Sequence, residues 1–566
     1  MRRLIWQIVI VILALLAIAI LLISQQPTLL PIVPEVQPAA GGVFTEGLVG
    51  SFGRLNPVLA FNNPADQDVN RLIFSSLMRF DDRGLPVYDL VESMGISRDG
   101  NNYNISLREN AEWHDGEPVT SADVLFTIEL LRSEEFPIPA GIRALWQAVE
   151  AEALDEQILQ IRLPEPFAPF IDFLTFGILP EHLLGGLSPQ ELIDSEFNLQ
   201  PVGSGPYRFE RMLVENDQIT GVVLEKFDEY YRNAPFIEQF VFRYYPDVKA
   251  VLTAHEQGEV LGISQITGEE LQSALRSPDL NLFTSQLPML RIIFFNLDNP
   301  EVSFFQNSSI RRALMMGIDR QQMIDSLLEG QAILAHGPIF PGSWAYYEGI
   351  EQIQYDPETA VSLLRQAGYA IPAEGGSTRI NEEGIALNFE LLYPEDQVYA
   401  PFAAAIASDW ARLGVSVELN PVPYPELVSD YLEPRTYQAA LVDLDLANSP
   451  DPDPYPFWHQ AQITGGQNYG KWDDRQASEY LEQARIELDR AERTRLYHNF
   501  QVRFASELPA LPLLYPVYNY GVDSSVQGVT VGPLYSPSDR FANVSEWFLV
   551  AERALEAESS PGVVNP

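Results

Sequence analysis

Two short segments of the sequence contain residue types that could do chemistry. The first is Trp113-His114-Asp115, where an indole, an imidazole and a carboxylate stand together and could be taken for a catalytic cluster. The following Gly116 changes this interpretation, because an Asp-Gly step is typical of a tight turn. We therefore interpret Trp113 as a core residue and the other two as turn residues, and we predict no catalytic role for them.

The second segment is the acidic stretch 441–458, LVDLDLANSPDPDPYPFW, which contains Asp443, Asp445, Asp451 and Asp453. Oxygen-rich turns of this kind bind hard cations, and carboxylates also accept strong hydrogen bonds from ammonium groups. A calcium loop of the EF-hand type needs Gly at its sixth position and Glu at its twelfth, and this stretch has neither. We therefore predict no metal site here.

Local signatures of the common enzyme classes are absent from the sequence. It has no HExxH, Walker or dinucleotide-binding motif, and Gly203-Ser204-Gly205 lacks the spacing of a nucleophile elbow. The absence of cysteine excludes disulfides, thiolate metal sites and a thiol nucleophile. The histidines are scattered without metal-ligand spacing, at His114, His182, His255, His336, His459 and His498. We predict that the protein is not an enzyme and carries no cofactor.

Composition predicts a large, acidic, folded protein. The chain has 566 residues, of which 46% are hydrophobic and 20% are charged, enough for two or three packed lobes. Its formal net charge of −43 would repel the phosphates of nucleic acids, and no Lys/Arg cluster with interleaved aromatic residues offsets this repulsion. We therefore predict no nucleic-acid partner. The negative charge is compatible with two roles: it attracts cationic ligands, or it simply keeps an exported protein soluble.

An apolar segment near the N-terminus predicts a membrane anchor. Leu4–Ile23 is apolar except for Gln7, and as a helix it is long enough to cross about 30 Å of hydrocarbon. The preceding Arg2 and Arg3 predict a cytoplasmic N-terminus and an extracytoplasmic body. A cleaved secretory signal is the alternative, but its apolar core would be shorter and an A-x-A-like site is missing. The proline-rich residues 24–42 are typical of a semi-rigid stalk.

Periodicity and capping residues predict a mixed α/β body. Asn102–Arg108 alternates polar and apolar residues like a half-buried strand, and Thr120 with Asp123 is typical of a capping box. Asp356 begins another helix, and Ala400–Leu413 forms one that ends at a glycine. We also predict a long charged helix at Arg475–Ser506 and a strand at Leu508–Gly521.

Three separated segments resemble a known family. Arg108–Thr127 contains a Trp-His-Asp-Gly turn before a capped helix, Pro201–Phe209 reads PVGSGPYRF, and Ile310–Gly330 reads IRRALMMGIDRQQMIDSLLEG. Together they resemble the family 5 extracellular solute-binding proteins, the dipeptide and oligopeptide receptors of ABC importers. The resemblance implies an α/β, two-lobed periplasmic-binding-protein-like fold of type II, with an extra subdomain in the first lobe and a hinge between the lobes.

The resemblance also implies how the chain is divided. The predicted parts are a transmembrane signal anchor at 1–23, a stalk at 24–42, a first lobe at 43–266 with an inserted subdomain at about 79–200, a second lobe at 267–515, a return to the first lobe at 516–550 and a disordered tail at 551–566.

Candidate ligand-binding residues follow from the same resemblance. In the peptide-binding relatives, an aspartate of the second lobe meets the α-amine of the peptide. Aligning Asp451 with the acidic-Pro step of the family puts Asn448 at that position, whereas a shifted gap would put Asp445 there. The other residues that the resemblance brings to the cleft are Trp458, Tyr469, Trp472, Glu46, Gly47 and Asn296. Core packing is the alternative role for the aromatic residues.

We predict from these observations the substrate-binding component of an ABC importer, which captures peptides between two lobes. Oligopeptides are preferred because Leu391–Pro401 lacks the arginine with which dipeptide-specific relatives clamp the ligand carboxylate. The alternatives are a receptor for a non-peptide solute, such as an oligosaccharide or a nickel chelate, and a surface sensor or chaperone-like receptor. The expected partners are the peptide-like solute, a permease with its ATPase, and the membrane. We expect a monomer at the extracytoplasmic face of the cell membrane or in the periplasmic space.

Overall fold

The computed structural model describes residues 36–81, 83–268, 270–446 and 451–553, in two compact units. The smaller unit pairs β1 (Val36–Ala39) with β20 (Val550–Arg553), and the larger unit runs from Ala40 to Leu549. The predicted anchor at Leu4–Ile23 lies outside the described residues. Within the part of the chain that is described, no helix combines the length and the apolar character needed to cross a membrane.

The strand pair corrects two predictions at the ends of the chain. Residues 36–39 belong to the predicted stalk and residues 551–553 to the predicted disordered tail, yet the two segments form an antiparallel ladder. Its register places Val36 opposite Arg553 and Ala39 opposite Val550. Each strand obtains its backbone hydrogen bonds from the opposite end of the chain, so neither segment carries a local signal for it.

The larger unit is built along one path of hydrogen-bonded strands. The order is β17-β16-β18-β14-β19-β12-β2-β11-β10-β9, and β13 and β15 also pair with β19. These strands are β2 (Val43–Val49), β9 (Tyr207–Glu215), β10 (Gln218–Lys226), β11 (Gln239–Tyr245), β12 (Gly262–Ile263), β13 (Leu280–Gln286), β14 (Met289–Phe295), β15 (Ala332–Leu334), β16 (Asn388–Pro394), β17 (Ser416–Val422), β18 (Ala439–Asp445) and β19 (Ala510–Asp523).

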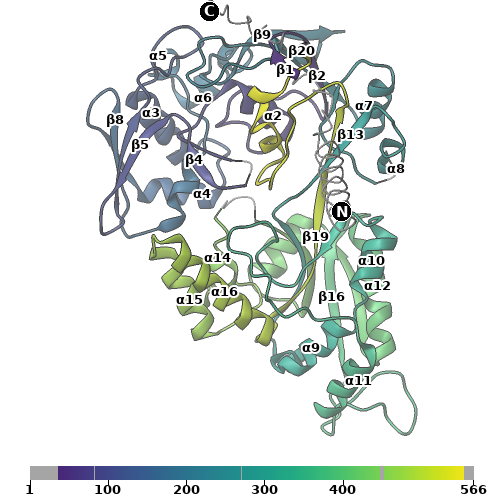
Figure 1. Cartoon of the computed structure of the whole chain (residues 1–566). Helices are drawn as coiled ribbons and strands as arrows, with labels where there is room; N and C mark the ends of the chain where they lie inside the picture. The colour runs from purple at the N-terminus through teal and green to yellow at the C-terminus, as the bar shows by residue number, and fades with distance from the viewer. Residues whose placement is uncertain (1–35, 82, 269, 447–450, 554–566) are drawn as a thin grey trace, which may run out of the picture. The chain divides into compact units, whose positions relative to one another are not determined.

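Strand β19 connects the two lobes. Its residues 510–516 pair with β14 and β15 of the second lobe, and its residues 517–523 pair with β13 and β12 of the first. Figure 1 shows β19 as the long yellow strand that continues from one lobe into the other. The second connection is the short step from β13 to β14. The sheet of the first lobe therefore extends to Gln286, beyond the boundary at residue 266 that we predicted.

The first lobe carries a separate sheet between its helix α2 (Pro64–Ile73) and β9. The order of this sheet is β5-β6-β8-β7, and α3 begins with the predicted capping box of Thr120 and Asp123. The elements of this segment are β3 (Met78–Phe80), β4 (Pro86–Tyr88), β5 (Val91–Ile96), β6 (Asn102–Leu107), α3 (Ser121–Arg132), α4 (Ala140–Ala148), β7 (Glu150–Ala153), β8 (Ile158–Arg162), η1 (Ala168–Leu174), α5 (Glu181–Leu184), α6 (Pro189–Ile193) and η2 (Glu196–Asn198). The segment packs one continuous apolar core with the first lobe.

Two of the motifs that we identified in the sequence pack against each other. The N–H of Gly203 donates to Nδ1 of His114, and Nε2 of His114 lies 3.0 Å from the carbonyl oxygen of Gly205. Burial lowers the pKa of His114 to about 4, which keeps the imidazole neutral. A Cβ on Gly203 would lie 1.9 Å from the carbonyl oxygen of Ile73. The role of His114 is therefore structural: its imidazole fixes the backbone of Gly203 and Gly205 in close contact with its neighbours.

Helices cover the sheet of the second lobe. The elements in this part and near the hinge are α7 (Val248–Glu256), α8 (Glu270–Ala274), η3 (Pro300–Gln306), α9 (Ser308–Met316), α10 (Arg320–Leu327), α11 (Pro357–Gln366), α12 (Tyr399–Leu413), α13 (Tyr424–Glu426), η4 (Leu427–Leu432), α14 (Tyr455–Trp458), η5 (Gln460–Gln462), α15 (Arg475–Ile486) and α16 (Arg490–Glu507), and after β19 come η6 (Pro537–Phe541) and η7 (Val544–Glu546). Helices α11 and α12 confirm the predictions from Asp356 and Gly414, since Asp356 caps α11 and Gly414 ends α12 with a φ of +84°.

The predicted long helix at Arg475–Ser506 was wrong in one respect. It consists of two helices, because the backbone turns to an extended conformation at Glu487 and a new helix starts after Asp489. The Asp489 carboxylate accepts a hydrogen bond from the N–H of Glu492, which is a standard N-cap. Helix α15 lies at the lobe interface, where it contacts η1 of the first lobe.

Candidate ligand-binding cleft

A cavity of about 560 Å³ lies between the inserted subdomain of the first lobe and the second lobe. The first lobe contributes the start of α4 and the residues around η1, and the second contributes the segment after β15, the end of β18 and α14. Its apolar lining includes Ile142, Leu145, Phe167, Phe173, Ile339, Phe340, Leu444, Leu446, Phe457 and Trp458. A cavity of this size with mainly apolar walls and few polar groups is typical of a small-molecule site.

Helix α4 forms one wall of the cavity, and only one of its side chains is buried in the core. Trp146 is buried, and its ring packs on Phe170 and Phe176 with centroid distances of 5.6 and 5.1 Å. This anchor leaves Ile142, about one turn earlier, and the adjacent Leu145 half-buried along the cavity. A wall that is held from behind by a buried Trp keeps its shape without a ligand.

Two acidic residues of the cavity are paired with arginines. The Asp453 carboxylate accepts a hydrogen bond of 2.7 Å from Arg485, and the Asp451 carboxylate lies 2.7 Å from Arg493. Burial raises the pKa of Asp451, and the positive charge of Arg493 opposes this rise. Buried charges of this kind require partners, and these two pairs hold residues 451–453, just before α14, in place.

The guanidinium of Arg485 also joins the two lobes. Its Cζ lies 3.7 Å from the centroid of the Tyr455 ring, on the second lobe, and 5.4 Å from that of Phe167, on the first. Cations over aromatic faces at these distances are attracted by the ring quadrupole. Arg485 therefore gives the cavity a cationic wall group that is in contact with both lobes.

Three of the residues that we predicted for the cleft line the cavity. Asp445, at the exposed end of β18, lines it together with the buried Asp451 and Trp458. Asn448 lies outside the described residues. The placement of Asp445 and Asp451 on one wall keeps both as candidates for contact with a ligand.

Of the remaining predicted residues of the second lobe, Trp472 and Asn296 are buried and Tyr469 is half-buried. Trp472 is buried against Phe500 and Phe504, and the ring of Tyr469 packs edge-on against Phe294. The side chain of Asn296 donates to the carbonyl oxygens of Arg435 and Tyr437, at 2.9 and 3.0 Å. None of these three is among the described residues that line the cavity. They act in this structure as packing and turn-forming groups.

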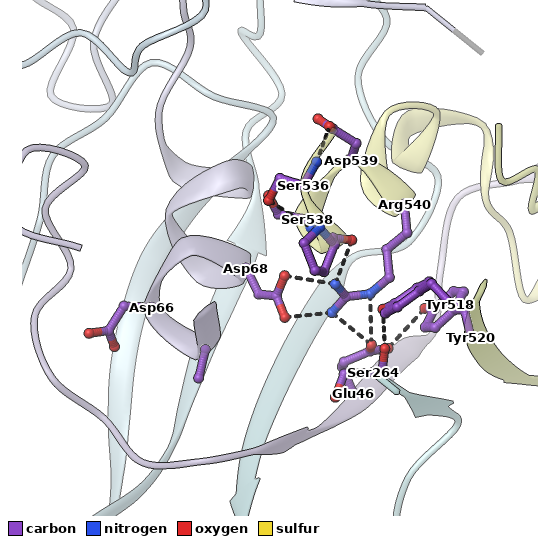
Figure 2. Close-up of polar contacts among 12 residues, drawn as sticks. Glu46, Asp66, Asp68, Ser264, Tyr518, Tyr520, Ser536, Ser538, Asp539 and Arg540 are labelled. Atoms are coloured by element: carbon purple, nitrogen blue, oxygen red, sulfur yellow. Dashed lines mark hydrogen bonds and ion pairs between the residues drawn. The ribbon is translucent and has the colours of Figure 1, made fainter. Parts of the chain in front are cut away.

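Glu46 lies in a fully buried ionic cluster of the first lobe, shown in Figure 2. Its carboxylate accepts hydrogen bonds from Arg540 on η6 and from the hydroxyl of Tyr520 on β19. Arg540 also binds Asp68 on α2 through two hydrogen bonds of 2.7 and 2.8 Å. Burial raises the pKa of Glu46 to about 7, against the opposing charge of Arg540 and with a further rise from Asp68. The cluster fastens the returning C-terminal segment to the first lobe.

Gly47 has a packing role next to this cluster. A Cβ on Gly47 would lie 2.3 Å from Cγ1 of Val251, which belongs to α7. The absence of a side chain thus lets α7 approach β2 closely. Neither Glu46 nor Gly47 is among the described residues that line the cavity.

Sequence reasoning missed the first-lobe wall of the cavity. Gly141, Ile142 and Leu145 lie on a short helix, whereas Phe167 caps the proline-containing η1 and Phe173 lies within it. A weak signal was available, since the run around Phe167 is apolar and rich in proline but has no strand or helix periodicity. Arg485 was hidden in a helix whose charged residues are otherwise typical of a solvated face.

The described residues contain no group of three or more His, Cys, Asp or Glu side chains arranged to hold a metal ion. This finding covers the described part of the acidic stretch, in which Asp451 and Asp453 turn toward arginines.

Comparisons with known proteins agree with the two-lobed architecture. A sequence model of the bacterial extracellular solute-binding proteins, family 5, matches residues 86–468. The chain is 23% identical over 518 residues to the oligopeptide-binding protein AppA of Bacillus subtilis (strain 168), which covers 91% of this chain and 92% of AppA. It is also 23% identical over 520 residues to the dipeptide-binding protein of Escherichia coli (strain K12), covering 84% of this chain and 92% of that protein.

A solved structure shares the fold. The structure of AppA from Bacillus subtilis in complex with a nonapeptide has a TM-score of 0.66 and 23% identity, and the match covers 91% of this chain and all of that one.

Proposed function

The chain belongs to the bacterial extracellular solute-binding proteins of family 5, and we propose that it is the substrate-binding component of an ABC importer that captures peptides between its lobes. The observation that carries the proposal is the cavity of about 560 Å³ with walls from both lobes, in a chain similar along most of its length to an oligopeptide-binding protein. A ligand that touches both walls favours the closed arrangement, because it binds that arrangement more tightly than an open one.

The lining of the cavity supports a ligand with apolar parts and few charges. Ile142, Leu145 and Phe167 offer apolar contact from the first lobe, while Arg485 and Asp445 offer charged groups from the second. Peptide side chains with apolar surface suit such walls, and water can bridge the polar groups of different peptides. Oligopeptides are therefore the solutes that we propose, and a non-peptide solute is the alternative.

We also propose the setting of this receptor. An apolar N-terminal segment after two arginines would anchor the protein to the cell membrane, with the lobes on the extracytoplasmic side. A permease with its own ATPase would receive the solute from a monomeric receptor, and no enzymatic activity is needed for this role.

The test uses the full chain in detergent micelles. Native mass spectrometry detects co-purified peptides, and thermal unfolding is then followed with a pooled peptide library. A ligand at about 100 times its Kd stabilises by about 2.7 kcal/mol. The unfolding entropy of a body of about 500 residues is near 1 kcal/mol/K, so the midpoint should rise by about 3 °C.

A matched pair of variants tests whether the shift of the unfolding midpoint comes from binding in the cavity. Gly141→Trp adds a large side chain where a Cβ meets no atom within 4 Å, and Gly141 lines the cavity, so the indole should occupy ligand space. Gly95→Trp makes the same change at an exposed strand position with equal room. The first variant should lose the peptide-dependent shift and the second should keep it. Stabilisation by a sugar or a metal chelate, with no response to peptides, would contradict the proposal.

A further inference from the structure

The corner between α15 and α16 contacts the inserted subdomain of the first lobe at two points. Arg485, in the last turn of α15, has its Cζ 5.4 Å from the ring centroid of Phe167. Leu488, between the two helices, lies against the turn at Gly100. A Cβ on Gly100 would lie 3.5 Å from Cδ1 of Leu488 and 3.3 Å from Cβ of Pro166. Neither Leu488 nor Gly100 is among the described residues that line the cavity, so this second contact is separate from the solute site.

Asp172 is a buried carboxylate on η1, the element of the first lobe that α15 contacts. Its exposed fraction is 6%, and within the described part of the chain its carboxylate accepts no hydrogen bond and forms no ion pair. The charges that act on it belong to Asp451, Arg493 and Arg490 of the second lobe. Burial raises the pKa of Asp172 well above its usual value, the negative charge of Asp451 raises it further, and the two arginines oppose the rise.

The two arginines do not bind Asp172 directly. Arg493 donates to the carboxylate of Asp451 at 2.8 Å, within the second lobe. Arg490 is exposed to solvent, and its Cζ lies 5.7 Å from the ring centroid of Trp344. A solvated cation beyond ion-pair distance is screened by water and salt, so it offsets little of the cost of a buried negative charge. Protonation of Asp172 removes this charge altogether.

The other charged groups on the elements that contact η1 interact elsewhere. On α15, Arg485 binds Asp453, and Arg475 binds Glu479 and Glu482. On β3, the charged side chain is Arg79, which belongs to a separate group with Arg71, Arg232 and Asp89.

Two buried tyrosines also face the cluster. Arg493 acts on Tyr103 of β6, and Asp172 acts on Tyr535. Burial raises the pKa of Tyr103 to about 12 and also raises the pKa of Tyr535, so neither phenol ionises below about pH 10. The hydrogen bond from Arg493 favours the ionised form of Asp451. A proton taken up by the two carboxylates is therefore held by Asp172.

We propose that the α15–α16 corner is a proton-dependent latch, which holds the lobes closed while Asp172 is protonated and releases them when it ionises. With the lobes apart, Asp172 loses its cover from the second lobe and ionises near pH 4 like an ordinary aspartate. Closure buries it beside Asp451, so closing takes up a proton. The closed arrangement is therefore fully favoured below about pH 4. Its ratio to the open arrangement falls up to tenfold for each pH unit above that, until the raised pKa is reached.

The latch has a consequence for capture of a solute. A solute that touches both walls of the cavity binds the closed arrangement, so its affinity falls as the closed population falls. This consequence rests on the proposed function, whereas the latch itself needs no solute.

The experiment measures closure without a solute. The chain contains no cysteine, so Leu154→Cys in the first lobe and Val502→Cys on α16 provide two exposed and unique positions for spin labels. Distances between the labels are recorded by pulsed electron paramagnetic resonance on the full chain in detergent micelles, from about pH 4 to about pH 9. The population that dominates at the acidic end should shrink as the pH rises, in favour of a second population. A distance distribution that stays constant across this range would overturn the proposal, whether or not the protein binds peptides.

Variants of Asp172 in the same labelled chain test the assignment of the proton. Asp172→Asn keeps the size of the side chain and mimics the protonated acid, so the acidic-end population should persist at every pH. Glu134→Gln removes an exposed carboxylate from the same subdomain and should follow the unmodified profile. Thermal unfolding confirms that each variant is folded. A pH response of Asp172→Asn equal to that of the unmodified chain would overturn the assignment.

A second pair of variants tests the corner itself. Leu488→Ser weakens the contact with the turn at Gly100 and should lower the closed population at each pH without changing its pH dependence. Ile486→Ser makes a similar change at the end of α15, where the side chain is 56% exposed, and should leave the population unchanged. Equal populations in Leu488→Ser and the unmodified chain would overturn the role of the corner as a latch.

Discussion

Replacement of the buried Glu46 by Gln should change how the stability of the protein depends on pH. Burial raises the pKa of Glu46 from 4.5 to about 7, although Arg540 at hydrogen-bond distance opposes the rise. The folded state therefore keeps a proton that the unfolded state releases between these two pH values. Stability from this group is complete below pH 4.5 and is lost as the pH rises through 7. Gln mimics the protonated acid at every pH, so the variant should lack this loss.

The structure sets the size of the effect. A pKa of about 7 in place of 4.5 corresponds to about 3 kcal/mol, because each pH unit is worth about 1.4 kcal/mol. No discount for solvent screening applies, since Glu46 is fully buried. For a cooperative body of about 500 residues, the unfolding entropy is about 1 kcal/mol/K. The midpoint of the unmodified protein should therefore fall by about 3 °C relative to Glu46→Gln between pH 4.5 and pH 8.

Differential scanning calorimetry of both proteins across this pH range measures the difference directly. Glu92→Gln removes a carboxylate from an exposed position of β5 and should follow the unmodified protein at each pH. Parallel pH profiles for the unmodified protein and Glu46→Gln would refute the reasoning, because they would mean that Glu46 is ionised throughout and that Arg540 fully offsets its burial.

Three further changes should reduce stability in ways that urea unfolding can measure. Arg540→Ala leaves two buried carboxylates without their cation and should cost about 3–5 kcal/mol, more than Arg540→Met with Glu46 and Asp68 neutralised as Gln and Asn. Asp489→Ala removes the N-cap of α16 and should cost about 1 kcal/mol, with Asp489→Asn nearly neutral. Gly203→Ala should cost several times more than Gly141→Ala, because the added Cβ meets a backbone oxygen only at residue 203.

The elements that the sequence predicts well are those whose signals are local. Asp356 and Gly414 mark helix ends by their own backbone conformation and hydrogen bonds, so a reader of the sequence can find them. The break at Asp489 was locally signalled too, since an aspartate with a glutamate three residues later is typical of a helix start. The charged composition across 475–506 carries no such signal, because it is equally compatible with one helix or two.

The roles of the predicted cleft residues were harder to predict, because the hydrogen-bond partners of these residues are far from them in the sequence. Glu46 and Arg540 are 494 residues apart, and Asn296 donates to carbonyl oxygens about 140 residues away. A glutamate on an entry strand and an asparagine after an inter-lobe strand have the same appearance in sequence whether they face a ligand or a buried partner. The free energy of burying the polar group decides between these two roles, since a buried carboxylate requires a cation.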